Sequence, residues 1–206
     1  MNIRILHRTS AMIIAPFVLV HLANHLASLA SIGAHLRFMD AARLVYRQPV
    51  IEALLLAAVA FQGASGSWLA ISRWRQRRGA VAWLQAGSGI YLILFLLNHV
   101  GAVLFGRLGL GLDTNFYFAA AGLHVAPFQF FFAPYYFLSV VALFTHIGCA
   151  LYWAGPARWR QRLSTVAVPM IAGALISVLL VISLAGRIQP FETPARYLQT
   201  YTRSVS

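Results

Sequence analysis

Lysine is absent from this 206-residue sequence, and acidic residues and cysteine are nearly absent. All sixteen basic residues are therefore arginine, and they face only four acids, Asp40, Glu52, Asp113 and Glu192. The single cysteine, Cys149, excludes an internal disulfide and a metal cluster held by cysteines. The chain also lacks a Gly-x-Gly-x-x-Gly turn, so no motif for a flavin, a dinucleotide or an iron–sulfur cluster is present.

What the sequence has in abundance is apolar surface. Hydrophobic residues make up 60% of it, charged residues only 10%, and the mean hydropathy is +0.74. These values are typical of an integral membrane protein. The net charge of +12 does not indicate a nucleic-acid partner, because the arginines lie in short loops between apolar runs, where they act as topology signals.

Five apolar stretches are long enough to cross a bilayer, and backbone in lipid must satisfy its own hydrogen bonds, which predicts helices. We expect the first stretch to remain as a helix rather than to be cleaved as a signal peptide, because it is long for such a segment. The predicted fold is all-α, an integral membrane bundle over residues 1–190 with a polar tail over 191–206. The five predicted spans are 9–30, 50–72, 80–106, 126–155 and 164–186.

The arginines predict the orientation of the helices. If the spans alternate in direction, nine arginines share one side, and the other side holds seven arginines and all four acids. Positive residues favour the cytoplasmic side, so the N-terminus is expected inside and the C-terminus outside. The nine are Arg4, Arg8, Arg73, Arg75, Arg77, Arg78, Arg158, Arg160 and Arg162.

Polar residues within the spans fall into two layers when position is converted to depth at about 1.5 Å per residue. His21, His25 and His99 lie roughly 20 to 27 Å from the inner helix ends and form an outer layer. Gln62 and His146 lie roughly 15 Å from the inner ends and form an inner layer. Ionisable residues inside a membrane are costly, which favours a functional role.

Two planes of imidazole across several helices are typical of haem b, whose iron takes one axial histidine from each of two helices. A lone intramembrane histidine is more often a helix–helix hydrogen-bond partner, but four at matching depths favour ligation. His7, His35 and His124 lie at helix ends or in loops, and for them we expect interfacial or solvated positions. Small residues near the layers would allow close approach: Gly63, Gly66, Gly87, Gly89 and Gly101.

Four segments resemble the single-chain, five-helix cytochrome b membrane anchor of succinate dehydrogenase/fumarate reductase. LHRTSA (6–11) and HLANH (21–25) are similar to the start and the ligand region of the anchor's first helix. LQAGSGIYLILFLLNHV (84–100) is similar to its third helix, and FTHIGCALYW (144–153) to its fourth. The resemblance covers about three quarters of the chain and rests on the order and spacing of the segments.

The resemblance implies specific haem ligands. His99 matches the third-helix ligand of the outer haem, and its partner in the first helix is His21 or His25. The two lie one turn apart on one face, so the sequence leaves both open, with His21 the better match to the family pattern. His146 matches the fourth-helix ligand of the inner haem.

Gln62 departs from the family pattern, because two-haem members have histidine at this position. Glutamine is a poor ligand of haem iron, so one haem b is expected and a second is in doubt. The inner haem would be absent, or bound by His146 with a weak sixth ligand. Alternatively, Gln62 would hydrogen-bond His146 and fill the inner site.

Three further sequence features each allow two interpretations. Arg8 and Ser10 match positions that help bind quinone in the family, but they are equally explained as a positive-inside anchor and a helix-start residue. Glu52 is expected to pair with Arg47 rather than to handle protons. The aromatic run FQFFFAPYYF (128–137) is expected to form the outer interfacial belt, with a quinone-tail groove as the alternative.

Taken together, the resemblance implies a non-catalytic subunit that passes electrons between quinone and the iron–sulfur subunit of a succinate:quinone or quinol:fumarate oxidoreductase. Its partners would be the flavoprotein and iron–sulfur subunits, at the inner face of a bacterial inner (cytoplasmic) membrane. Three alternatives remain: a haem-free quinone-binding anchor, a structural membrane subunit, or a small transporter that uses its histidines. No acidic residue lies in a helix core and no broken-helix pair is evident, which disfavours the transporter.

Overall fold

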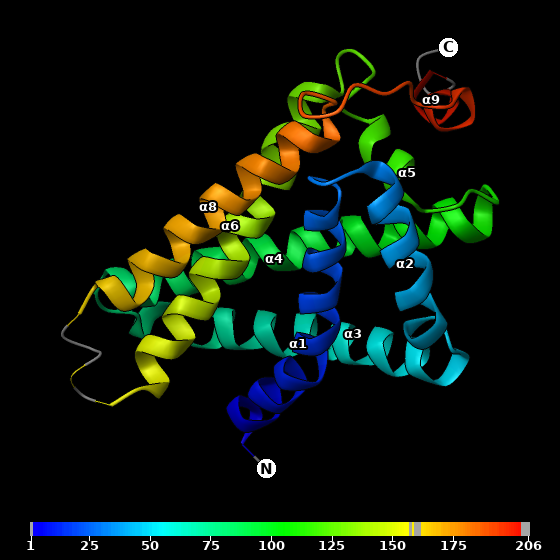
Figure 1. The fold of residues 1–206 in the computed structure, drawn as a ribbon. Coiled ribbons are helices and arrows are strands. Elements are labelled where there is room, and N and C mark those ends of the chain that lie inside the picture. The colour runs from blue at the N-terminus through cyan, green and yellow to red at the C-terminus, as the bar shows by residue number, and fades with distance from the viewer. Residues whose placement is uncertain (1, 157, 159–161, 203–206) are drawn as a thin grey trace.

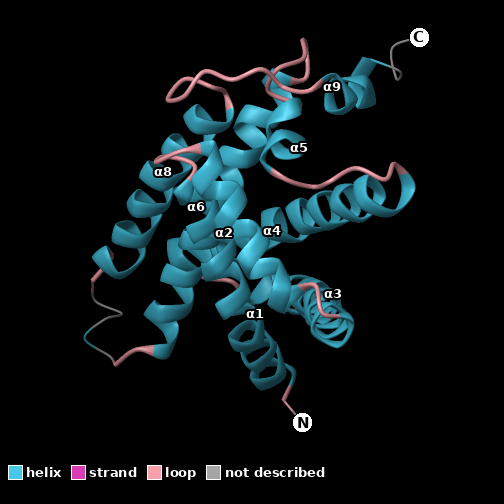
Figure 2. Cartoon of the chain, turned by 45° about the vertical axis from the view of Figure 1, so that its right-hand side comes forward, coloured by secondary structure: helices cyan, strands magenta, loops and turns pink. Residues whose placement is uncertain are grey.

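The computed structural model describes residues 2–156, 158 and 162–202 of the chain, and no β-strand occurs among them. Five helices are long and apolar enough to cross a membrane, so the predicted all-α multi-pass membrane fold is confirmed (Figures 1 and 2). The spanning helices are α1 (Ile3–Ala27), α3 (Pro49–Ser72), α4 (Ala80–Leu104), α6 (Gln129–Ala154) and α8 (Ser164–Leu184).

The helix boundaries follow local signals. The Asn2 side chain accepts from the Arg4 amide and so starts α1 six residues earlier than the apolar pattern predicts. Pro49 begins α3, where its missing N–H costs nothing. Gly79, with φ of 80°, makes the tight entry into α4, a conformation that a β-carbon would disfavour.

Besides a single 3-10 turn (Trp74–Gln76), three short α-helices of the described chain lie outside the spans and were not predicted. They are α2 (Ile32–Tyr46), α5 (Phe116–Ala121) and α9 (Ala195–Thr202); Figure 1 shows α5 and α9 near the C-terminus, and α2 running from beside α5 to the start of α3. A π-helical turn (Phe105–Gly109) prolongs α4. The tail beyond residue 190 packs against α5 through Tyr197, which is completely buried and stacks on Tyr117.

The spanning helices form two groups that diverge from one another. In Figure 1, α6 and α8 run side by side, while α3 and α4 run together in a different direction and α1 crosses in front of them. Glycine makes the α6–α8 pair close: a β-carbon at Gly148 would lie 3.1 Å from the Cα of Val166, and one at Gly173 would lie 2.6 Å from the Cβ of Phe144.

Ion pairs fasten the end of the molecule that carries α2. Arg43 of α2 contacts Asp113 at 2.8 Å and Asp40 at 3.6 Å. Glu52 pairs with Arg107 at 2.5 Å, so the expected Glu52–Arg47 pair is wrong. The π-helical turn after α4 brings Arg107 back over the start of α3, and Arg47 donates instead to Thr114 at 3.1 Å. Closeness in the sequence therefore did not predict that Glu52 pairs with Arg107.

Candidate functional site

All three histidines of the predicted outer layer lie close together, two on α1 and one on α4. The ring centres of His21 and His99 are 5.9 Å apart, with the ring planes at 71°. His21 and His25 have ring centres 4.7 Å apart, one helical turn from each other. We call His21, His25 and His99 the outer histidine cluster.

Hydrogen bonding does not account for these three side chains. Within the residues that the structure describes, no hydrogen bond reaches an imidazole nitrogen of His21, His25 or His99. Their recorded contacts are with aromatic rings: Phe17 stacks on His21 at 5.7 Å, and Phe95 stacks on His99 at 5.0 Å. An unpaired polar group inside a membrane is costly. Packing alone therefore does not explain why these three imidazoles keep nitrogens without hydrogen bonds.

The separation of His21 from His99 suits a pair of axial ligands. Two imidazoles on one metal ion, each bonded at about 2 Å, have ring centres roughly 6 Å apart. No group of three or more His, Cys, Asp or Glu in the described part of the chain is arranged to hold a metal ion. That finding disfavours a compact three-ligand site, whereas haem iron takes only two axial ligands from the protein.

His35, expected to be interfacial or solvated, is instead buried beside the outer histidine cluster, with 1% of its surface exposed. Its ring lies 5.3 Å from that of His25 and 5.4 Å from that of Phe116. Its Nδ1 donates to the Asn24 carbonyl at 2.9 Å, which ties α2 to the end of α1. Burial lowers the pKa of His35, an effect that the Asn24 carbonyl opposes and the nearby Arg43 reinforces.

The inner layer is arranged differently, because His7 lies inside it. His7 was also expected to be interfacial or solvated, but it is partly buried, with Nδ1 2.8 Å from Ser65 Oγ and Nε2 3.2 Å from Gln62 Nε2. Ser10 is buried and its hydroxyl donates to Gln62 Oε1. We call His7, Ser10, Gln62 and Ser65 the inner polar node.

The bonds of the inner polar node fix the tautomer of His7. The Gln62 amide N–H can only donate, so His7 Nε2 accepts and His7 Nδ1–H donates to Ser65. Ser65 in turn donates to the Gln62 carbonyl at 3.3 Å. Both nitrogens of His7 are therefore used, and Gln62 fills this layer by bonding His7 and Ser10 rather than His146.

His146 stands apart from the inner polar node. Its Nδ1 lies 3.2 Å from the Gln85 carbonyl and 3.3 Å from Ser88 Oγ, which leaves Nε2 without a hydrogen-bond partner among the described residues. A backbone bond at one nitrogen with the other free is the arrangement usual in a metal-ligating histidine. A β-carbon at Gly89 would lie 3.1 Å from its ring, so this glycine admits the imidazole itself.

The glycines predicted near the two layers differ in what surrounds them. A β-carbon at Gly66 would lie 3.3 Å from the His7 ring, whereas Gly63, Gly87 and Gly101 have no atom within 4 Å of that position. Two of the five predicted glycines thus make room for histidines of the inner layer, and three face open space. His124, as expected, is exposed, and its Nε2 donates to the Leu184 carbonyl at 2.9 Å.

The structure does not bring Arg8 and Ser10 together as a pair. Arg8 is exposed and has no recorded hydrogen bond or ion pair, while the buried Ser10 hydroxyl is used by Gln62. A ligand that needed both side chains would have to break the bond between Ser10 and Gln62. Within the RWRQR segment, residues 159–161 lie outside the described residues.

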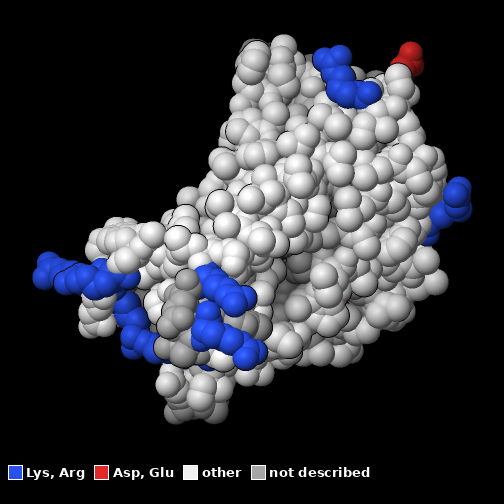
Figure 3. All heavy atoms as spheres, turned by 60° about the vertical axis from the view of Figure 1, so that its left-hand side comes forward, with Lys and Arg blue, Asp and Glu red and all other residues white. Residues whose placement is uncertain are grey.

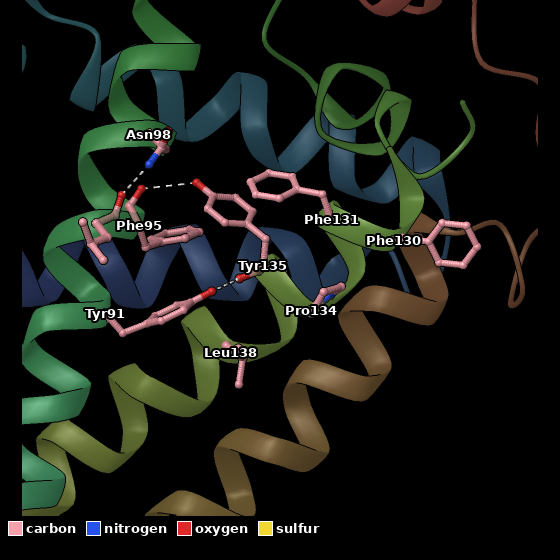
Figure 4. A pocket seen from close by; sticks show the side chains of 9 residues that line it. Tyr91, Phe95, Asn98, Phe130, Phe131, Pro134, Tyr135 and Leu138 are labelled. Atoms are coloured by element: carbon pink, nitrogen blue, oxygen red, sulfur yellow. Dashed lines mark hydrogen bonds between the residues drawn. The ribbon is translucent and has the colours of Figure 1, made fainter. Parts of the chain in front are cut away.

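The aromatic run forms one wall of a pocket between α4 and α6 with a volume of about 310 Å³ (Figure 4). Phe130, Phe131, Pro134 and Tyr135 line it from α6, opposite Tyr91, Leu94, Phe95 and Asn98 of α4. The pocket adjoins the outer histidine cluster, since Phe95 contacts both Tyr135, at 4.9 Å between ring centres, and His99.

Most polar groups of this pocket already form hydrogen bonds within the chain. Tyr91 donates to the Tyr135 carbonyl at 3.0 Å, and Tyr135 donates to the Phe95 carbonyl at 3.2 Å (Figure 4). Asn98 donates one N–H to the Leu94 carbonyl at 2.9 Å. Its second N–H and its Oδ1 have no partner among the described residues, so Asn98 is the side chain that could bond a ligand here.

No family model, curated protein or solved structure matches this chain. The arrangement of the side chains and the resemblance of the four sequence segments are therefore the indications of function.

Proposed function

We propose that this protein is a membrane cytochrome b anchor that carries one haem b between His21 and His99. The observation that supports it most is the outer histidine cluster, whose imidazoles have no hydrogen-bond partner in the described chain and whose His21–His99 spacing suits two axial ligands. Haem b, when bound, supplies an iron that accepts and gives up one electron. The two histidines would hold that iron, and Phe17 and Phe95 would orient their rings by stacking.

We further propose that a quinone exchanges electrons in the pocket between α4 and α6. Asn98 has both a free N–H for a quinone carbonyl and a free Oδ1 for a quinol hydroxyl, and the aromatic walls suit a flat ring. This pocket is a better candidate than Arg8 and Ser10, because Ser10 is already bonded within the inner polar node.

The remaining parts of the proposal concern assembly and location. The arginines before α1 and between α3 and α4 lie next to the first residues of these helices. Figure 3 shows most of the basic side chains of that face in its lower left part, with further basic side chains near the acid at the top. The positive-inside rule favours a cytoplasmic position for this end in a bacterial inner membrane. Iron–sulfur and flavoprotein subunits of a succinate:quinone or quinol:fumarate oxidoreductase would dock on that side.

The first experiment is a dithionite-reduced minus oxidised spectrum of the purified chain, with haem quantified per polypeptide. We expect one low-spin b-type haem, and its complete loss in His99→Ala. His124→Ala, at an exposed histidine away from the cluster, is the matched control and should keep the spectrum. A wild-type chain without haem, expressed with adequate haem supply, would refute the cytochrome assignment and favour the haem-free anchor.

A further inference from the structure

A second feature of the surface is a groove between α3 and α4. Ser67, Ile71 and Trp74 line it from one side, and Ile90, Ile93 and Leu94 from the other, with a volume of about 160 Å³. Trp74, Ile71 and Leu94 are each at least half exposed, so the groove opens on the outer surface of the bundle. Such a depression within a membrane span is filled by acyl chains.

The groove ends at the RWRQRR segment (73–78), where aromatic and basic side chains are ordered together. The Arg77 guanidinium lies 4.9 Å from the ring centre of Trp74 and 5.7 Å from that of Trp83, and it donates to the Ala70 carbonyl at 2.5 Å. The ring centres of the two tryptophans are 5.1 Å apart. Arg77 therefore acts as a positioning residue that holds Trp74 at the mouth of the groove.

The charge of this segment is not balanced within the chain. Arg73, Arg75 and Arg78 are exposed, and Nη1 of Arg77 is buried without a partner among the described residues. All four acids lie at the opposite helix ends: Glu52 in the first turn of α3, Asp40 and Asp113 near Arg43, and Glu192 beyond α8. Four arginines within six residues thus have no carboxylate to pair with.

From this juxtaposition we infer that the α3–α4 groove and the RWRQRR segment form a binding site for an anionic phospholipid. The phosphate would contact Arg73, Arg75 and Arg78, and an acyl chain would lie along Ile71 and Ile90 beneath Trp74. Guanidinium groups suit phosphate oxygens, and tryptophan prefers the headgroup level. The apolar groove continues into the span, where a soluble acidic protein does not reach, and this favours a lipid. The inference does not depend on haem.

The test uses the full chain in phosphatidylcholine vesicles that contain a trace of spin-labelled lipid. The fraction of motionally restricted label gives the association of phosphatidylglycerol relative to phosphatidylcholine. We expect a preference of about fivefold or more for phosphatidylglycerol, the effect of one arginine near a membrane surface. The triple variant R73Q/R75Q/R78Q should lower the ratio to about one, because its charge is removed. The R73K/R75K/R78K variant keeps the charge and should keep most of the preference.

Two controls separate the site from general electrostatics. R37Q/R187Q/R196Q removes the same charge from the other end of the molecule and should leave the preference unchanged. Ser67→Leu fills the groove and leaves the arginines intact, so it should weaken phosphatidylglycerol association, whereas Ser67→Ala should not. Equal association of both lipids with the wild-type chain would overturn the inference. An equal loss of preference in R73Q/R75Q/R78Q and in R37Q/R187Q/R196Q would overturn it too. Arginine-dependent capture of a polyglutamate peptide without lipid preference would assign the segment to an acidic protein.

Discussion

The outer histidine cluster and the inner polar node contain the same kind of side chain in opposite bonding states. In the inner polar node, both nitrogens of His7 are hydrogen-bonded, one to Ser65 and one to Gln62, and Gln62 also accepts from Ser10. In the outer histidine cluster, no nitrogen of His21, His25 or His99 is hydrogen-bonded within the described chain. Depth and residue type alone therefore do not distinguish the two layers, whereas the hydrogen bonding of their side chains does.

The largest expected effect distinguishes the two histidines of α1. His21 lies against His99, while His25 lies against His35, so His21→Ala should remove the haem and His25→Ala should retain most of it. Haem per polypeptide after purification measures the difference. If His21→Ala retained haem and His25→Ala lost it, His25 rather than His21 would be the axial ligand from α1. Loss in both would mean that the cluster acts as a unit.

A smaller effect tests the inner polar node. Gln62→Ala leaves His7 Nε2 without its partner and the Ser10 hydroxyl with only the His7 carbonyl as acceptor, so the free energy of unfolding should fall by about 1–3 kcal/mol with the haem content unchanged. Unfolding in mixed micelles of increasing sodium dodecyl sulfate content, followed by circular dichroism, measures it. Gln48→Ala, at an exposed glutamine before α3, is the control and should change stability little. Loss of haem in Gln62→Ala would show that the two layers are coupled.

The smallest effect concerns His35, which joins α2 to the outer histidine cluster. Burial lowers the pKa of His35 below its ordinary 6.5, so the unfolded chain binds a proton first as the pH falls. The contribution of this residue to stability is therefore complete above pH 6.5 and declines below it, by at most about 1.4 kcal/mol per pH unit. His35→Gln should lose less stability than the wild type between pH 7.5 and 5.5, measured by thermal unfolding in detergent. An equal loss of stability in His35→Gln and the wild type would contradict this.

Much of the fold was predictable because long apolar runs leave few alternatives in a membrane. The five spans and the shared depth of His21 and His99 could be read from composition and spacing, whereas the departure at Gln62 comes from the resemblance of the four segments. The bonding of Gln62 to His7 rather than to His146 could not be predicted, because His7 lies directly before Arg8 in a segment that reads as a helix end. Only the cap at Asn2, which lengthens α1, brings His7 beside Gln62.

The connections between spans were predicted less well. Residues 32–46 have mixed polarity and no long apolar run, and they form α2 because Ser31 caps the Ala34 amide at 2.9 Å and Arg43 finds Asp113 far along the chain. His35 becomes buried by that docking. The Glu52–Arg107 pair likewise depends on the π-helical turn, which no local pattern indicated. Contacts between distant segments, rather than local propensity, decide these positions.

Cys149 lies fully buried between Val81 of α4 and Val166 of α8, at the junction of three spanning helices. It is also the only thiol in the sequence, so a maleimide added to the purified chain in lipid vesicles has one target. Its labelling rate would report how often α4, α6 and α8 separate, in the bilayer and without detergent. Because α6 approaches α8 closely at Gly148, Cys149 is labelled only when these helices move apart, and its labelling rate therefore measures this local opening.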